Sequence, residues 1–358
     1  IQVGQGAWGI DWARMILPTV PGVEVIARVD GDPLARSVAA DALGEPASLY
    51  FASLQAALDR VGGDAVLATV PLVAHAGVAR AALAAGRHVI VEKPFAASLA
   101  EAADLVRRAE AAGRVLMVSQ NYRHYAAPLA VATLLAEGAI GAIDRVEVTF
   151  RHRAEASGYR YYDLAQPLLS DMAIHHFDLM RMVLADEPLE IACRAEIAPG
   201  SRFAGPPAAE ATIRFRRGAA VSYRGSWLGP DPPTAWAGEW DMAGGGGTLW
   251  WTSRGSGERA APDRAILRRG DGVAVPVPLA PPPLVDRAGC LAAFADRVAG
   301  VAEPPHFPSG RDNLHSLAMV EAAIRSAGDG GRPVAVAALL AEVEDAAPVG
   351  LGRDGALG

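Results

Sequence analysis

The segment from His88 to Pro94 joins an apolar run to a carboxylate, an ammonium group and a proline. Residues 88–91 are typical of a buried β-strand, and the charged pair Glu92-Lys93 follows where that strand would end. Charged groups at the carboxyl end of a strand lie at the edge where open α/β sheets bind ligands. An arbitrary Glu-Lys pair is more often a solvated ion pair beside a turn, so this assignment needs support from elsewhere in the chain.

A second group with acid/base potential lies in the stretch from Asp171 to Arg181. On a helix, Asp171, His175 and Asp178 are spaced i, i+4 and i+7, so they would share one face. A carboxylate beside an imidazole orients the ring and favours its charged form. His176 would point elsewhere and is expected to be structural. Two alternatives are a purely salt-bridged structural helix and a metal site. No third ligand follows, so no metal is predicted.

A glycine-rich turn opens the chain, as Gly4-Gln-Gly6-Ala7-Trp8-Gly9. It stands between an apolar start and an amphipathic helix that ends at Pro18, the context in which this spacing indicates dinucleotide binding. The first glycine permits a tight turn and the second lets the backbone approach a pyrophosphate. The third lets helix and strand pack closely.

Asp30 is the residue expected to select the cofactor. It follows a predicted strand at about 20 residues after the last glycine, the spacing of a ribose-binding acid. A carboxylate there accepts hydrogen bonds from the 2′-hydroxyl and repels a 2′-phosphate. No Arg stands in the following residues 31–33. The sequence therefore favours NAD over NADP, the alternative being that Asp30 only opens a turn.

The elements that would position these groups alternate between strands and helices up to residue 120. Strands are predicted at 1–3, 23–29, 49–51, 65–69, 88–91 and 115–119, with helices at 33–43, 53–61, 74–85 and 98–112. This alternation predicts a doubly wound parallel sheet. Thr69 and His75 would lie just past a strand end, on the ligand-binding edge, although a lone His is more often a satisfied residue at a helix start.

After residue 120 the pattern becomes rich in strands, which indicates a second, α+β domain with a mostly antiparallel open sheet. Strands are predicted at 143–151, 189–197, 211–216, 219–227, 239–242 and 248–252, and helices at 127–136, 285–299, 311–327 and 336–345. The predicted division is 1–120, 121–330 and a C-terminal segment 331–358, helical and then frayed.

The composition excludes several classes of partner. The net charge is −7, and Lys and Arg do not cluster with aromatic residues, so no nucleic acid partner is expected. No apolar run is long enough to span a membrane. Cys193 and Cys290 are far apart and are expected to be buried thiols of a reducing, cytoplasmic compartment, the alternative being a disulfide. The chain opens at Ile1 without Met, so the natural start is expected to be missing and an export leader stays an open question.

These motifs resemble those of the glucose–fructose oxidoreductase / inositol dehydrogenase / MocA family. The matching features are the glycines of 4–9, Asp30, the run Ala84–Pro94, Asn121-Tyr122-Arg123, and Asp171-x-x-x-His175-x-x-Asp178. They fall in both predicted domains in the expected order, so the resemblance is expected to cover nearly the whole chain. The sequence departs from many members at Pro167-Leu-Leu-Ser170, where those carry a glycine run. The approach of substrate to the backbone is expected to differ there.

The resemblance implies a Rossmann domain followed by a domain whose open sheet forms the interface of a homo-oligomer, a dimer or tetramer. It implies NAD(P)-dependent oxidation of a sugar or cyclitol hydroxyl, or the reverse reduction. Lys93 would be the catalytic Lys and would share the substrate oxygen with His175, the acid/base. Asp171 would be the partner of His175 or a substrate ligand, and the Lys93–Pro94 peptide bond would be cis.

The expected ligand contacts follow from the same resemblance. The cofactor-binding residues would be Gly4, Gly6, Ala7, Trp8, Gly9, Asp30, Thr69, His75, Glu92, Lys93 and Gln120. The substrate-binding residues would be Lys93, Tyr122, Arg123, Tyr162, Asp171 and His175.

Two other functions stay open. A tightly bound NAD can oxidise a substrate transiently, so that a glycosidic bond is cleaved or a group is eliminated. The chain can also be a non-catalytic NAD-binding regulator. The joint presence of Lys93, Asp171 and His175 weighs against the regulator, because a binding module has no need of all three.

Overall fold

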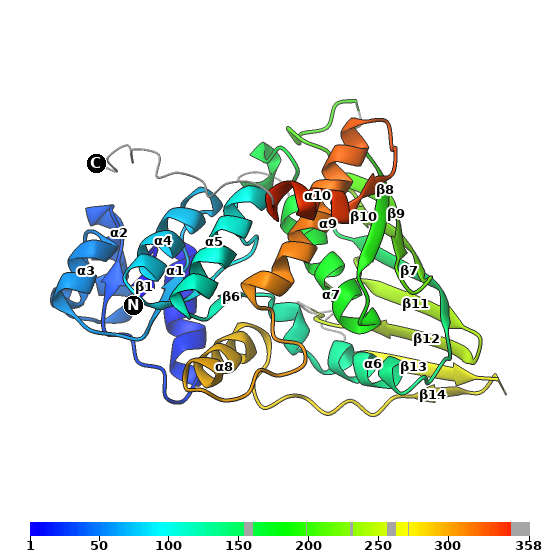
Figure 1. The fold of residues 1–358 in the computed structure, drawn as a ribbon, viewed down its shortest axis with the longest axis horizontal. Helices are drawn as coiled ribbons and strands as arrows, with labels where there is room; N and C mark the ends of the chain where they lie inside the picture. The colour runs from blue at the N-terminus through cyan, green and yellow to red at the C-terminus, as the bar shows by residue number, and fades with distance from the viewer. Residues whose placement is uncertain (154–159, 198, 230–231, 256–262, 271, 345–358) are drawn as a thin grey trace. The chain divides into compact units, whose positions relative to one another are not determined.

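The computed structural model describes residues 1–153, 160–197, 199–229, 232–255, 263–270 and 272–344. The chain forms two compact units (Figure 1). Unit 1 contains residues 1–121, 284–314 and, among the described residues, 342–344, and unit 2 contains residues 122–283 and 315–341. Residues 284–314, which the sequence assigned to the second domain, thus belong to unit 1.

Unit 1 is built on a six-stranded parallel sheet in the order β3-β2-β1-β4-β5-β6. The strands are β1 (Gln2–Val3), β2 (Arg28–Val29), β3 (Tyr50–Phe51), β4 (Ala65–Ala68), β5 (His88–Val91) and β6 (Leu116–Val118). The strand order reverses between β1 and β4, and such switch points are where open α/β sheets bind ligands. The predicted doubly wound sheet is confirmed. The predicted strand 23–29 is shorter, since only its last two residues pair with β1 and β3.

Side-chain hydrogen bonds and left-handed glycines set the ends of two helices of unit 1. The helices of this unit are α1 (Ala7–Asp11), which continues into a π-helical turn (Trp12–Ile16), α2 (Pro33–Leu43), α3 (Leu54–Arg60), α4 (Leu72–Ala84), α5 (Leu99–Ala112) and α8 (Asp286–Val298). Asp32 and Ser98 accept hydrogen bonds from backbone N–H groups in the first turns of α2 and α5. Gly44 and Gly113 end these helices in the left-handed conformation.

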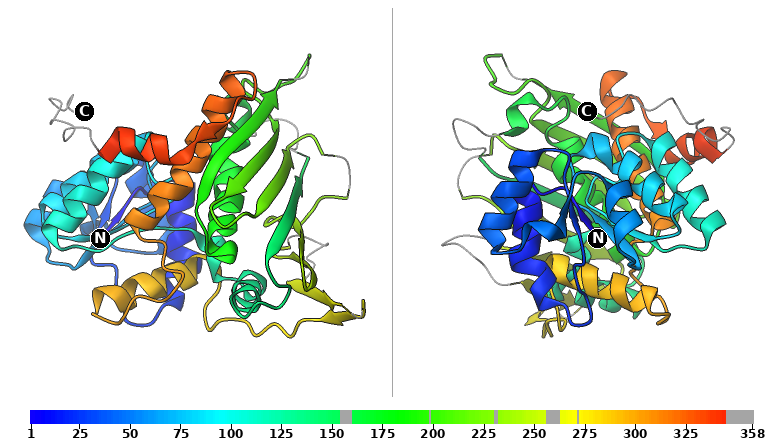
Figure 2. Two further views of the ribbon diagram at one scale, coloured as in Figure 1. Left: turned by 45° about the vertical axis from the view of Figure 1, so that its right-hand side comes forward. Right: turned by 90° about the vertical axis from the view of Figure 1, so that its left-hand side faces the viewer.

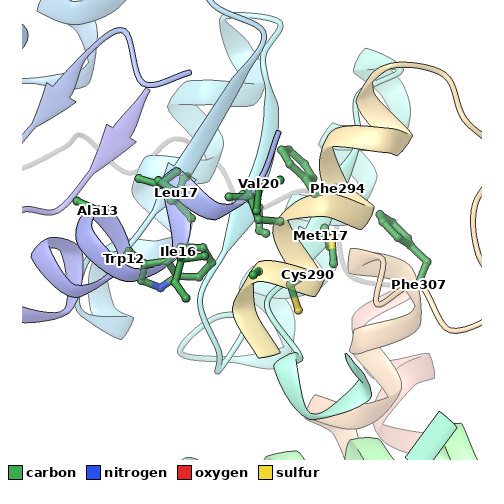
Figure 3. Close-up of a cluster of buried hydrophobic side chains, with 13 residues drawn as sticks. Trp12, Ala13, Ile16, Leu17, Val20, Met117, Cys290, Phe294 and Phe307 are labelled. Carbon is green, nitrogen blue, oxygen red and sulfur yellow. The ribbon is translucent and has the colours of Figure 1, made fainter. Parts of the chain in front are cut away.

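The core of unit 1 joins the first helix to α8, which lies far along the chain (Figure 3). Trp12 and Leu17 pack with Phe294 of α8 and Met117 of β6 in one buried cluster. Both Trp12 and Met117 are fully enclosed. The segment around α8 is therefore an integral part of the fold that carries the glycine-rich turn.

Unit 2 contains a nine-stranded sheet in the order β14-β13-β12-β11-β7-β10-β9-β8-β15. The strands are β7 (Ile143–Arg151), β8 (Pro188–Glu196), β9 (Ala208–Phe215), β10 (Ala220–Ser226), β11 (Glu239–Gly244), β12 (Gly247–Thr252), β13 (Arg264–Arg269), β14 (Ala274–Pro276) and β15 (Val334–Ala335). All neighbouring strands are antiparallel except β7 and β10, which are parallel. The predicted mostly antiparallel sheet is confirmed. The sequence missed β13, β14 and β15, which are short or rich in Arg.

Unit 2 contains the helices α6 (Ala126–Ala136) and α7 (Ile174–Leu184), and most residues of α9 (Gly310–Gly328) and α10 (Val336–Glu344). Figure 2 shows α6 and α7 on one face of the large sheet. Side chains alternate along β9 and β10 between buried and exposed, because one face packs on helices and the other does not. The predicted frayed end, residues 345–358, lies outside the described residues. No helix in the described part of the chain is long and apolar enough to cross a membrane.

Candidate active site

The glycine-rich turn after β1 has the shape that a dinucleotide requires. Gly4 has a φ of +97°, and a Cβ there would lie 2.8 Å from backbone atoms of Thr69 and Val70. A Cβ at Gly9 would lie 2.0 Å from the carbonyl oxygen of Gly4, so both positions accept only glycine. At Gly6, in contrast, a Cβ would meet no described atom within 4 Å. The tight turn thus leaves its middle open for close approach of a phosphate, so these residues fit the cofactor.

A buried polar network that the sequence analysis missed supports this turn. The amide of Gln2 donates to the carbonyl of Gly9 at 2.8 Å, and the hydroxyl of Thr69 lies 2.8 Å from the carbonyl oxygen of Gly4. Arg28 donates to the side chain of Gln2 and forms an ion pair with Glu45 at 2.5 Å. Thr69, predicted to contact the cofactor, therefore also holds the turn. The sequence signal for this network was the presence of polar side chains, Gln2 and Arg28, inside predicted strands.

The carboxylate of Asp30 lies against the same turn. One oxygen accepts the backbone N–H of Gln5 at 2.8 Å, and the other accepts that of Asp32 at 2.9 Å. The structure also adds an arginine that the sequence analysis overlooked, because α2 returns the side chain of Arg36 to this position. Its guanidinium donates to the carbonyl oxygen of Asp30 at 2.6 Å and to that of Gly31 at 3.2 Å. A carboxylate and a guanidinium thus both lie where the ribose is expected.

Lys93 is half-buried at the carboxyl end of β5, and its peptide bond to Pro94 is cis, as the sequence predicted. The preceding carboxylate, Glu92, is buried and accepts a hydrogen bond from the indole of Trp12 at 2.7 Å. Its other oxygen accepts the backbone N–H of Lys93 at 3.2 Å. Burial raises the pKa of Glu92. Glu92 therefore links the backbone of Lys93 to Trp12, in the helical turn that follows α1.

The sequence analysis missed a further signal at this position. Lys93 is the only lysine in the 358-residue sequence, and every other residue among the 33 Lys and Arg is an arginine. Arginine does not lose its proton in proteins, whereas a lysine ammonium does when its pKa is lowered. The one lysine of the sequence thus lies just past a strand end, on the ligand-binding edge.

His75 and Gln120 differ in their surroundings. The ring nitrogens of His75 lie 2.9 Å from the carbonyl oxygen of Pro94 and 3.0 Å from that of Val70, and burial lowers the pKa of the ring. His75 thus connects α4 to the Lys93–Pro94 turn.

Gln120 is 1% exposed, and neither amide atom of its side chain has a hydrogen-bond partner among the described residues. A buried amide without partners costs free energy, so Gln120 suits a ligand contact.

In unit 2, the predicted helix over 171–181 begins differently from the expectation. Leu169–Ala173 form a π-helical turn before α7 begins at Ile174. Asp171 is half-buried in that turn, and His175 is 4% exposed in the first turn of α7. The predicted single α-helix over these residues is therefore a π-helical turn followed by α7, and the shared face of Asp171, His175 and Asp178 stays a prediction.

The imidazole of His175 has an aromatic neighbour. Its ring stacks on that of Tyr122, with 4.0 Å between the centroids and 5° between the planes. The guanidinium of Arg254 lies over the Tyr122 ring at 4.6 Å and donates to its hydroxyl oxygen at 2.9 Å. Arg254 has a φ of +59°, which is unusual for a residue other than glycine. The sequence analysis predicted Tyr122 as a substrate contact and missed Arg254.

Asp178 forms a buried ion pair with Arg123 in unit 2. Both of its oxygens accept hydrogen bonds at 2.6 Å from the guanidinium of Arg123, and one also accepts the hydroxyl of Ser316 at 2.7 Å. Asp178 is 1% exposed and Arg123 is also buried. This geometry favours a structural role for Arg123 over the predicted substrate contact.

Two other predictions concern residues near this helix. His176 lies 3.1 Å from the hydroxyl of Tyr223 and 3.0 Å from the carbonyl oxygen of Trp236, and burial lowers its pKa to about 4. The expected structural role of His176 is confirmed. Tyr162 is half-buried and meets Phe203 edge-on at 4.7 Å, so its substrate contact stays a prediction. Tyr159, three residues before Tyr162, lies outside the described residues.

Comparison with known proteins adds independent information. Residues 2–120 match the profile of an oxidoreductase family with an NAD-binding Rossmann fold, and residues 128–249 match a GFO/IDH/MocA C-terminal domain. The chain is 28% identical over 340 residues to D-apiose dehydrogenase of Paraburkholderia graminis, across 90% of this chain and 86% of that protein. It is 28% identical over 274 residues to 1,5-anhydro-D-fructose reductase of Ensifer adhaerens, across 75% of this chain and 78% of that protein.

A solved structure shows the same fold. It is an oxidoreductase of Agrobacterium radiobacter in complex with NAD+, L-tartaric acid and magnesium, with a TM-score of 0.81 and 24% identity. The match covers 94% of this chain and 98% of that one, so the shared fold includes both units.

Proposed function

Because the chain belongs to the GFO/IDH/MocA family of oxidoreductases, we propose that it transfers hydride between NAD and a hydroxyl or keto carbon of a sugar, cyclitol or related derivative. The observation that carries this proposal is Lys93, the only lysine of the sequence, at the carboxyl end of β5. The relatives named above are a sugar dehydrogenase and a reductase of a sugar derivative. They support a carbohydrate substrate here.

The proposed chemistry divides the work between cofactor and protein. When bound, NAD supplies the acceptor or donor of the hydride. The backbone at Gly6 would hold the cofactor phosphates, and Lys93 would accept or donate the hydroxyl proton at its Nζ atom. His175 is the second proton-transfer group, kept in its plane by Tyr122, and Asp171 is its partner or a substrate ligand.

We also propose that NAD is preferred over NADP. Asp30 supports this preference, because its negative charge would lie beside a 2′-phosphate. Arg36 opposes it, because a guanidinium at the same position would attract that phosphate. The hydrogen bonds from Arg36 to the carbonyl oxygens of Asp30 and Gly31 use part of the guanidinium, which leaves fewer donors for a phosphate.

The test of Lys93 uses two variants and a panel of sugars and cyclitols. Lys93→Ala should lower turnover by about 10³-fold or more, because the proton-transfer group is lost, while the affinity for NAD changes little. Lys93→Arg keeps the positive charge but cannot release a proton, so it should be nearly as impaired. Near-normal turnover in either variant would refute the role of Lys93.

The same panel separates the alternative functions. The reaction is followed both as substrate consumed and as absorbance of the reduced nicotinamide. Consumption without net reduction of NAD would show transient oxidation instead of a dehydrogenase reaction. Tight NAD binding with no turnover on any substrate would favour a regulator.

We further propose that the exposed face of the large sheet joins copies of the chain. On this face, Arg224 pairs with Glu210 across β10 and β9 at 2.8 Å, and both side chains are well exposed. The proposed oligomer would be a dimer or tetramer, as in the resemblance above. Arg224→Glu places two carboxylates side by side there and should weaken self-association in sedimentation equilibrium. A monomeric wild-type protein would contradict this proposal.

A further inference from the structure

Arg287, at the start of α8, lies against the glycine-rich turn although the two segments are far apart in the sequence. It donates to the carboxylate of Asp11, 276 residues away, at 2.6 Å. Its guanidinium lies over the ring of Trp8 at 4.2 Å and near that of Trp12 at 5.3 Å. Trp8 is itself part of the turn, between Gly6 and Gly9. A positive charge is thus fixed on the element that is expected to hold the cofactor phosphates.

One donor of this guanidinium is unsatisfied. The Nη1 atom of Arg287 is buried and has no hydrogen-bond partner among the described residues, whereas Nη2 is used by Asp11. A buried charged donor without an acceptor costs more than a neutral one. The arrangement therefore lacks one acceptor, which a ligand can provide.

The start of α8 is held in place by more than this ion pair. Asp286 has a φ of +58° and accepts a hydrogen bond from the side chain of Asn121, which follows β6. Left-handed backbone at a residue other than glycine persists only where surrounding contacts enforce it. Cys290 and Phe294 of the same helix are buried in the core around Trp12 (Figure 3). The fold thus fixes the position of Arg287.

We infer that Arg287 is a further cofactor-binding residue, which donates from Nη1 to the pyrophosphate of the dinucleotide. The acceptor is assigned as phosphate because a guanidinium binds phosphate oxygens strongly and because Trp8, on which it lies, belongs to the phosphate-binding turn. The inference rests on dinucleotide binding by that turn. The competing explanation is that Arg287 only connects α8 to α1 through Asp11.

Two matched variants separate these explanations, since each breaks the same ion pair. The measurement is calorimetric affinity for ADP-ribose, which contains the pyrophosphate, and for adenosine, which lacks it. Arg287→Gln should weaken ADP-ribose binding by about tenfold or more and leave adenosine binding within about twofold. Asp11→Asn should retain or strengthen ADP-ribose binding, because it removes a negative charge beside the guanidinium.

The outcomes are distinct. Equal losses of ADP-ribose affinity in the two variants, or an Arg287→Gln variant that binds it like wild type, would overturn the role of Arg287. A wild-type protein that does not bind ADP-ribose would instead refute dinucleotide binding itself. If Arg287→Gln does not fold, Arg287→Lys takes its place. It keeps a point charge without the fork, so it should weaken ADP-ribose binding more than Asp11→Asn does, and the reverse order would overturn the inference.

Discussion

The rings of Tyr122 and His175 lie parallel, with 4.0 Å between their centroids. Tyr122 is the first residue of unit 2 and His175 belongs to the first turn of α7. Stacking fixes the plane of the imidazole, and the guanidinium of Arg254 in turn lies over the tyrosine ring. The orientation of the proposed acid/base group therefore depends on an aromatic neighbour.

Removing the stacking surface should impair catalysis more than removing the hydroxyl. Tyr122→Leu loses a contact worth about 0.5–1.5 kcal/mol, and kcat should fall about tenfold because the imidazole is no longer held in plane. Tyr122→Phe keeps the ring and should stay within about threefold of wild type. Steady-state kinetics at saturating NAD measures both. Equal kcat values for the Leu and Phe variants would contradict a role for the stack.

The ion pair of Arg123 and Asp178 should matter for stability. Asp178→Asn leaves a buried guanidinium without its counter-charge, so the free energy of unfolding should fall by about 3–5 kcal/mol. Glu110→Gln is the control, because it breaks an exposed pair with Arg311 and should cost less than about 1 kcal/mol. Urea denaturation gives both values. Similar losses in the two variants would show that burial is not the cause.

Cofactor preference should respond to Asp30 and Arg36 in opposite directions. Asp30→Ser removes the charge that repels a 2′-phosphate and should raise the ratio of kcat/KM for NADP over NAD by about tenfold or more, that is ~1.4 kcal/mol. Adding Arg36→Met to that variant should lower the ratio again, because the guanidinium is lost. The absorbance of the reduced nicotinamide measures each rate. A wild-type protein that uses NADP alone would refute the assignment of Asp30.

Acid should destabilise the protein through His176. Burial lowers the pKa of this imidazole from 6.5 to about 4, so between these values the unfolded chain takes up a proton that the folded chain does not. The contribution is fully present above pH 6.5 and is lost as the pH falls toward 4, by up to about 3 kcal/mol.

The test of His176 compares slopes, because the substitution also removes hydrogen bonds. His176→Gln lacks the titrating group, so its Tm should fall less steeply than that of wild type between pH 6.5 and 4. His75, whose pKa is also lowered by burial, is present in both proteins and cancels in the comparison. Parallel curves of Tm against pH would contradict the assignment.

Local sequence alone determined much of this protein. Caps and left-handed glycines set the ends of α2 and α5, because these interactions join residues that are neighbours in the chain. The order of strands and helices gave the parallel sheet. The glycine spacing at 4–9 and the charged end of β5 marked the ligand-binding edge, since parallel strands present their carboxyl ends on one side of a sheet.

Tertiary structure alone decided which side chains meet. The sequence pattern predicted one helix over 171–181, whereas the structure has a π-helical turn at Leu169–Ala173 before α7. It also took packing to pair Asp178 with Arg123, His175 with Tyr122, and Arg287 with Asp11. Partners so distant in the chain meet only after loops close and cores pack, and no periodicity in the sequence encodes the partner. The importance of Lys93 is visible in the sequence, where it is the one lysine, and in the structure, where it follows the end of β5.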